Sequence, residues 1–245
     1  MTTLEICTPS FTSVLEAQTG GADRIELCQN LELGGTTPSF ALLKMTWEAL
    51  NIPIAVLIRP RGGDFIYTSD DQQVMKKDIE FCRQLGVEAV VVGALTAKGS
   101  LNETLCRRFV DWAYPLDVVF HRAIDKCLDP LEALHQLINW GYQRILTSGQ
   151  AQQAPEGRTL FQSMVQEAGG RITIMAGGGL TPDNLADFIR YTQVTDVHLS
   201  AKKTVRSLAS TAGQVSLATQ GLPENDYLQT DATTVRQIKN ILNHL

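Results

Sequence analysis

Several features that would assign a chain to a class are missing from these 245 residues. No apolar run approaches the roughly 20 residues that a membrane-spanning helix needs. The start, Met-Thr-Thr-Leu-Glu, lacks the basic and apolar parts of an export signal. Lys and Arg number 21 against 26 Asp and Glu and form no basic stripe. We therefore expect a cytoplasmic protein with no membrane span and no nucleic-acid partner.

Cysteine is scarce, and a dinucleotide fingerprint is absent. The five cysteines are odd in number and widely spaced, so we expect free thiols rather than a disulfide framework. The first predicted strand is followed by Cys-Thr-Pro-Ser instead of G-x-G-x-x-G. The three glycines at 177–179 lack the spacing of that fingerprint. These absences disfavour a doubly wound dinucleotide-binding fold.

Short apolar runs alternate with amphipathic stretches along the whole chain. Eight runs rich in Val, Ile and Leu are predicted as strands: 4–7, 24–28, 54–58, 89–93, 117–121, 144–147, 172–175 and 194–198. Helix starts lie between them, for example Ser10 as an N-cap and Pro130 and Pro182 in first turns. The pattern predicts an α/β fold, a (β/α)8 TIM barrel, formed as one domain by residues 1–245.

A long polar stretch, 203–230, separates the eighth predicted strand from the last predicted helix, 231–245. Two interpretations stay open, a mobile loop or a cover over the barrel mouth.

The third predicted strand opens into Arg-Pro-Arg-Gly-Gly-Asp at 59–64. Arg59 and Arg61 can offer planar donor forks to a carboxylate or phosphate, and the two glycines let the backbone approach a ligand. We include Asp64 in this candidate anion site. The alternative is a structural arginine cluster that pairs with acids across the barrel mouth.

Two Glu-x-Cys steps end neighbouring strands. Because side chains repeat every two residues along a strand, Glu5 shares a face with Cys7, and Glu26 with Cys28. With His121 from the fifth strand, the two glutamates are our candidates for general acid/base residues. The alternative for each glutamate is a salt-bridged layer that fills the barrel.

Other strand ends add groups suited to an anion. Arg122 follows His121, with Asp125 in the same loop, which favours His121 over His198 as a site residue. Gly177 and Gly178 follow the seventh strand, and Ser200 follows the eighth, where many barrels bind phosphate on backbone amides. A small anionic molecule is therefore an expected partner.

Cys7 and Cys28 allow a second interpretation. Two thiolates on adjacent strands can bind a soft metal such as Cu(I). On spacing alone, small buried hydrophobic residues are favoured instead, because twenty intervening residues do not resemble a CxxC pair.

The strand-end motifs together resemble the copper homeostasis protein CutC family. The matching segments lie at 4–7, 21–28, 34–39, 58–65, 120–123, 145–149, 175–179 and 197–201. The resemblance implies a TIM barrel, a cytoplasmic location, a homodimer or larger homo-oligomer, and a role in copper tolerance. It also implies copper, as Cu(I), bound by Cys7 and Cys28.

Two functions remain open from the sequence. One is a copper protein that binds Cu(I) through the cysteine pair. The other is an uncharacterised lyase, isomerase or hydrolase that acts on a small phosphorylated or carboxylated compound. The second accounts for Arg59, Arg61, His121 and Arg122, which a copper carrier would not need. A Schiff-base aldolase is disfavoured, because no lysine ends a predicted strand.

Overall fold

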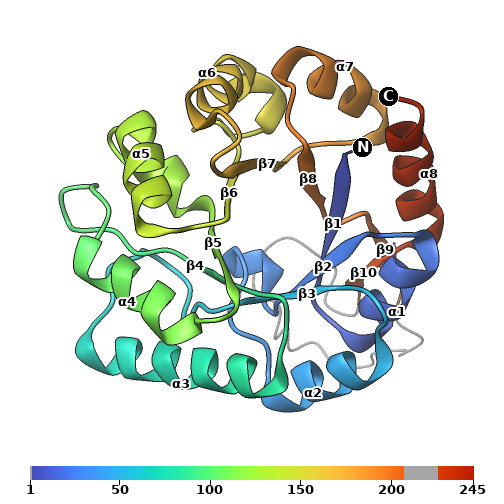
Figure 1. Ribbon diagram of the computed structural model, residues 1–245. Coiled ribbons are helices and arrows are strands. Elements are labelled where there is room, and N and C mark those ends of the chain that lie inside the picture. The colour runs from blue at the N-terminus through green and yellow to red at the C-terminus, as the bar shows by residue number, and fades with distance from the viewer. Residues whose placement is uncertain (1, 207–225) are drawn as a thin grey trace, which may run out of the picture.

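The computed structural model describes residues 2–206 and 226–245. Eight parallel strands pair in chain order, and β8 pairs with β1, so the barrel is closed (Figure 1). The predicted (β/α)8 fold and all eight predicted strands are confirmed, within a few residues at their ends. The strands are β1 (Thr3–Thr8), β2 (Arg24–Leu27), β3 (Ile54–Leu57), β4 (Ala89–Val92), β5 (Asp117–Phe120), β6 (Arg144–Thr147), β7 (Thr173–Gly177) and β8 (Asp196–Leu199).

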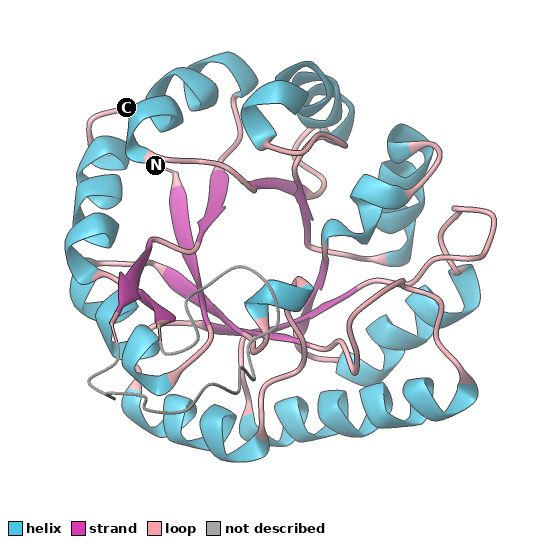
Figure 2. Cartoon of the chain, turned by 180° about the vertical axis from the view of Figure 1, so that it is seen from behind, coloured by secondary structure: helices cyan, strands magenta, loops and turns pink. Residues whose placement is uncertain are grey.

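Helices surround the strands on the outside of the barrel (Figure 2). They are α1 (Phe11–Gly20), α2 (Phe40–Ala49), α3 (Ser69–Leu85), α4 (Glu103–Ala113), α5 (Pro130–Trp140), α6 (Arg158–Ala168), α7 (Pro182–Thr192) and α8 (Ala232–Asn243). Short 3-10 turns add η1 (Leu31–Leu33), η2 (Arg122–Lys126) and η3 (Ala154–Gly157). The predicted start of α1 is confirmed, because the Ser10 side chain accepts a hydrogen bond from Ser13 N. None of the described helices is both long and apolar enough to cross a membrane.

The hydrophobic core has two parts that follow from the strand period. Outward-facing side chains such as Val90 and Ile145 pack against the helices in the larger part. Inward-facing side chains such as Val91, Leu146 and Met175 fill a smaller core inside the barrel. The inner core therefore packs beneath the side chains at the carboxyl ends of the strands, where barrel sites lie.

The last helix packs closely against the first. A Cβ added at Gly20 would lie 2.4 Å from Val235 Cβ and 2.9 Å from the carbonyl oxygen of Ala232. A side chain at position 20 would therefore collide with α8, and only glycine at the end of α1 allows the two helices to pack so closely.

The polar stretch 203–230 contains structure that the sequence did not predict. An antiparallel pair, β9 (Lys202–Val205) and β10 (Tyr227–Thr230), brings its two ends together. This pair is tied to α1, because Thr230 N donates to Ser13 Oγ at 3.1 Å. The predicted mobile loop or cover falls on 207–225, outside the described residues.

Candidate functional site

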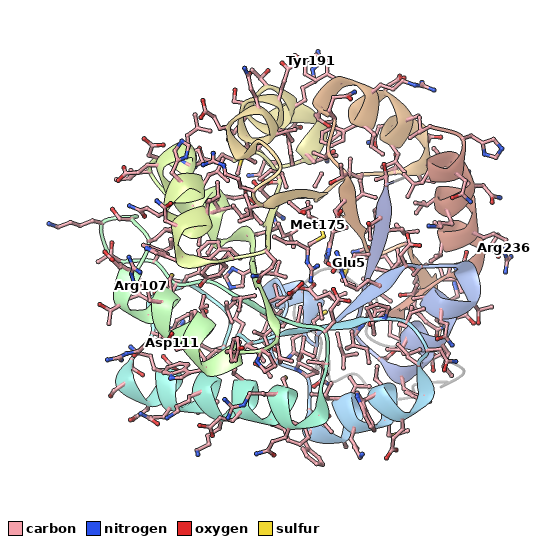
Figure 3. The ribbon with its side chains drawn as sticks, viewed as in Figure 1. Glu5, Arg107, Asp111, Met175, Tyr191 and Arg236 are labelled. Atoms are coloured by element: carbon pink, nitrogen blue, oxygen red, sulfur yellow. The ribbon has the colours of Figure 1, made fainter. Side chains whose placement is uncertain are left out.

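The alternation of strand residues places charged and thiol side chains inside the barrel. Glu5 and Cys7 project inward from β1, and Cys7 is in register with Glu26 on β2. Figure 3 shows Glu5 and Met175 within the ring of strands, whereas Tyr191 and Arg236 lie on the outer helices. The two Glu-x-Cys steps therefore lie side by side at the carboxyl end of the barrel.

A buried chain of charges lies below the mouth. The Glu5 carboxylate accepts from Arg24 Nε at 2.5 Å and lies 2.7 Å from His198 Nδ1. His198 Nε2 lies 3.6 Å from Glu26 Oε2. On the other side, Arg24 Nη2 donates to Asp196 at 3.0 Å. One imidazole thus lies between two buried carboxylates, and one guanidinium anchors the chain.

These contacts separate the pKa values of the two glutamates. Burial would raise the pKa of Glu5, but His198 and Arg24 outweigh burial and lower it to about 2. Burial raises the pKa of Glu26 to about 7, against the opposing charge of His198. Burial opposes protonation of His198, yet Cys7 and the carboxylates raise its pKa well above the usual value. Glu5 therefore stays ionised, whereas Glu26 can exchange a proton near neutral pH.

A cavity of about 160 Å³ lies above this chain. It brings together six of the predicted site residues: Cys7, Glu26, Cys28, Arg59, His121 and Arg122. Glu5 lies beneath it, bonded to His198, which also lines it. Apolar side chains complete the wall, among them Leu57, Phe65 and Leu146. Charged and thiol side chains therefore line one part of the cavity, and apolar side chains line the rest.

Arg59 is buried and holds the surrounding loops. Its Nη1 donates to the carbonyl oxygens of Leu33 and Gly35 at 2.8 and 2.6 Å, and its Nη2 donates to that of Gly63 at 2.9 Å. Its Nε has no hydrogen-bond partner among the residues that the structure describes. The side chain carries a positive charge into the protein without a carboxylate hydrogen-bonded to it from residues 2–206 or 226–245.

Arg61 and Asp64 lie outside the cavity. They form an ion pair of 3.0 Å with each other, and Arg61 Nη2 also donates to the carbonyl oxygen of Ile66 at 2.7 Å. Asp71 lies 3.4 Å from Arg61 Nε. The strand-end motif at 59–64 is therefore divided, because only its first arginine turns into the barrel.

His121 is a neutral hydrogen-bond donor rather than a base. Its Nδ1 accepts from Ala123 N at 3.1 Å, which assigns the proton to Nε2. Burial, and then the charge of Arg59, lower its pKa to about 3. The Nε2 atom is buried and has no partner within the described ranges.

Arg122 is fixed at the rim of the cavity. Its Nε donates to Asp125 at 2.8 Å and its Nη2 to Ser148 Oγ at 2.6 Å. A Cβ added at Gly178 would lie 3.4 Å from Arg122 Nη1, so the glycine loop packs directly against the guanidinium. Gly177 packs against Leu146 in the same way. Gly178 thus shapes the position of Arg122, although neither glycine lines the cavity.

Ser200 also lies away from the cavity lining. Its carbonyl oxygen accepts from Thr230 Oγ1 at 3.4 Å, which links the end of β8 to β10.

The two cysteines suit only a metal of low coordination number. Cys28 is fully buried, and burial and Cys7 raise the pKa of its thiol well above the usual value. Cys7 is 6% exposed and lines the same cavity. In the described part of the chain, no group of three or more His, Cys, Asp and Glu is placed to hold a metal. Two thiols are donors for a soft metal such as Cu(I) rather than for a metal that needs three or more protein ligands.

Sequence reasoning missed two central residues. Arg24 begins β2 and was not recognised as the partner of Glu5, although its spacing of two from Glu26 indicates the same inward face. The sequence favoured His121 over His198, because Arg122 and Asp125 follow His121 in the same loop. The contacts of His198 come instead from Glu5 and Glu26 on other strands.

The fold and the position of the site define a TIM-barrel protein with its candidate site at the carboxyl ends of the strands. The CutC family model matches residues 2–203, and the chain belongs to the CutC family. A family protein CutC from Histophilus somni (strain 2336) is 43% identical over 240 residues, covering 97% of this chain and 98% of the relative.

Two further relatives match over most of this chain. The human copper homeostasis protein cutC homolog is 41% identical over 245 residues, covering 98% of this chain and 90% of the relative. The crystal structure of a CutC protein from Streptococcus agalactiae is 32% identical, with a TM-score of 0.79. It covers 82% of this chain and 99% of that chain.

Proposed function

We propose that this protein takes part in copper homeostasis by binding one Cu(I) ion, as cargo, through Cys7 and Cys28. The observation that carries the proposal is that both thiols line one cavity from neighbouring strands. The name of the human relative, a copper homeostasis protein, supports it. Cu(I) is a soft ion that accepts two thiolates, whereas harder divalent ions need more ligands.

Copper binding at this site requires loss of thiol protons. The pKa of Cys28 is raised by burial, so binding should release protons and strengthen as pH rises. Two thiolates and one Cu(I) carry a net charge of −1, and His198 and Arg59 lie on the same cavity to offset it. Both groups would therefore stabilise the negative charge of the bound Cu(I) and its two thiolates.

An anaerobic competition titration against a chromophoric Cu(I) chelator tests this proposal. Wild type is expected to take up one Cu(I) per chain, and the double variant Cys7→Ser/Cys28→Ser is expected to take up none. Cys82→Ser is the matched control, because Cys82 is an equally buried free thiol on α3, away from the cavity. Equal uptake by the double variant and wild type would show that the pair is structural.

A second candidate function is acid/base catalysis by a lyase, isomerase or hydrolase on a small phosphorylated or carboxylated compound. The specific observation that favours it is the chain Glu5, His198 and Glu26, which ends on a cavity that Arg59 and Arg122 also line. Glu26 and His198 would exchange the proton, and Glu5 would orient His198. His121 would act as a neutral donor instead of the acid/base group that its position suggested.

A thermal-shift screen of phosphorylated and carboxylated metabolites tests the second candidate. We expect at least one anion to raise Tm in wild type, with the shift lost in Arg122→Gln. Arg107→Gln is the control, because Arg107 makes its ion pair on the surface of α4. For any hit, Glu26→Gln should abolish turnover and leave binding in place. A screen without any shift would count against this function.

We also propose that the protein is cytoplasmic, that it forms a homodimer or larger homo-oligomer, and that the whole chain is one domain. All five cysteines are free, which agrees with a reducing compartment. Light scattering coupled to gel filtration measures the subunit number, and a monomer at micromolar concentration would contradict the expected oligomer.

A further inference from the structure

Arg59 carries a buried positive charge, and none of its hydrogen bonds within the described residues goes to a carboxylate. Its side chain is buried, with 4% of the residue exposed, and its described partners are three backbone carbonyl oxygens. Carbonyl oxygens satisfy donors but do not neutralise a cation. Burying an unpaired charge is costly, and Nε–H additionally has no acceptor in hydrogen-bonding geometry in the described part of the protein, where the nearby Tyr67 hydroxyl also lacks a partner.

His121 presents a second donor of the same kind. The residue is 5% exposed, and its Nδ1 is occupied by Ala123 N. The proton therefore lies on Nε2, which is buried and has no acceptor among residues 2–206 and 226–245. Unlike a charged histidine, this group brings a hydrogen bond without a further positive charge.

Both donors belong to the wall of one cavity. Arg59 and His121 line it, and Phe65 contacts both, with its ring 5.1 Å from Arg59 Cζ and 4.9 Å from the His121 ring. Phe65 itself lines the cavity, and both N–H groups are buried, so a ligand can reach them only if this part of the cavity wall moves. Leu57 and Leu146 make the rest of this wall apolar.

We infer that the cavity binds a small monocarboxylate whose oxygens accept hydrogen bonds from Arg59 Nε and His121 Nε2 and whose apolar body packs against Phe65, Leu57 and Leu146. This inference rests on the second candidate function and names its ligand class. It does not require the copper proposal to be correct.

Charge, donor number and size select a monocarboxylate over a phosphate. Arg59 is the lining cation without a carboxylate partner in the described residues, because Arg122 pairs with Asp125 and His198 with Glu5, so the unpaired charge matches one negative charge. Two N–H donors match the two oxygens of a carboxylate. A cavity of about 160 Å³ also limits the ligand, since a cavity of about 150 Å³ holds a molecule the size of benzene.

Isothermal titration with benzoate, 2-oxobutanoate, benzyl alcohol and inorganic phosphate tests the inference. We expect benzoate or 2-oxobutanoate to bind one per chain, and benzyl alcohol and phosphate to bind far more weakly. His121→Asn keeps an acceptor for Ala123 N but removes the Nε2 donor, so it should weaken binding by about ten- to a hundredfold. His121→Gln, whose amide nitrogen reaches further, should restore most of it. His135→Asn is the control, because His135 is an exposed side chain on α5 and its loss should not change the affinity for the carboxylate.

A second measurement guards against a misfolded variant. In wild type, the ¹⁵N shift of His121 Nε2 should move when the carboxylate binds. The inference is overturned if neither carboxylate binds wild type, if His121→Asn binds as tightly, or if the Nε2 signal does not move. Phosphorylated hits that depend on Arg122, without any carboxylate binding, would overturn this inference and leave the second candidate function standing. If no anion binds at all, this inference and the second candidate function are both wrong.

Discussion

Replacing Glu5 with glutamine tests the buried charge chain beneath the cavity. Glu5 is 1% exposed and contacts both Arg24 Nε, at 2.5 Å, and His198 Nδ1, at 2.7 Å. Glutamine keeps the shape but leaves two cations facing a neutral amide. Removing one partner of a buried ion pair costs about 3 to 5 kcal/mol. Because Arg24 keeps Asp196 at 3.0 Å, we expect a loss near the lower limit, about 3 kcal/mol.

Urea unfolding at pH 7 measures this loss as a lower midpoint with an unchanged slope. For a chain of this length, the same loss lowers Tm by roughly 6 to 12 °C. Glu103→Gln is the matched control, because Glu103 forms an exposed pair with Arg107 at 2.9 Å and should hardly matter. If Glu5→Gln is no less stable than Glu103→Gln, the charge chain does not stabilise the barrel and the reasoning is wrong.

A double-mutant cycle separates the pair from its surroundings. Arg24→Met leaves Glu5 and Asp196 buried without their shared cation, so it should cost at least as much as Glu5→Gln. The double variant Glu5→Gln/Arg24→Met removes both charges, and its loss should be smaller than the sum of the two single losses. Additive losses would show that the two side chains do not interact.

Three further predictions concern His121, Gly20 and the cavity that Cu(I) and benzoate would share. Folded His121 has a pKa of about 3 against 6.5 unfolded, so only the unfolded chain gains a proton between these values. Stability should therefore fall as pH drops through this window, by about 2 to 3 kcal/mol at pH 4.5, and urea unfolding should show a shallower fall in His121→Asn. Gly20→Ala should cost about 1 to 3 kcal/mol in the same assay, because its Cβ overlaps Val235. Cu(I) should weaken benzoate binding in a calorimetric competition, and an unchanged affinity would contradict a shared cavity.

The barrel was predictable because its strands carry their own signal. Runs such as Ala89–Val92 are apolar throughout, since both faces of a barrel strand are buried, and glycine, proline and N-caps mark the helices between them. The β9 and β10 pair carries no such signal. Its strands, Lys-Lys-Thr-Val and Tyr-Leu-Gln-Thr, are half exposed and polar. They pair although more than 20 residues separate them in the sequence.

The site was predictable in its positions but not in its partners. Period two correctly set Glu5 beside Cys7 on an inward face, because that requires only a local rule. Which cation meets Glu5 depends on the register between strands, and Arg24 lies opposite Glu5 in the ladder. The turn after β3 likewise decides that Arg59 enters the barrel while Arg61 pairs with Asp64 outside. Such choices depend on three-dimensional contacts that no sequence spacing encodes.

The two proposed functions are linked because they use one cavity. A Cu(I) ion held by Cys7 and Cys28 and a carboxylate held by Arg59 and His121 would each add one negative charge to about 160 Å³. Two such charges about 6 Å apart repel by about 3 kcal/mol at an effective dielectric constant of about 20. That is roughly a hundredfold in affinity, and linkage requires each ligand to weaken the other by the same factor. If both proposals hold, Cu(I) would bind more tightly when the carboxylate is scarce, and one cavity would serve both functions at different times.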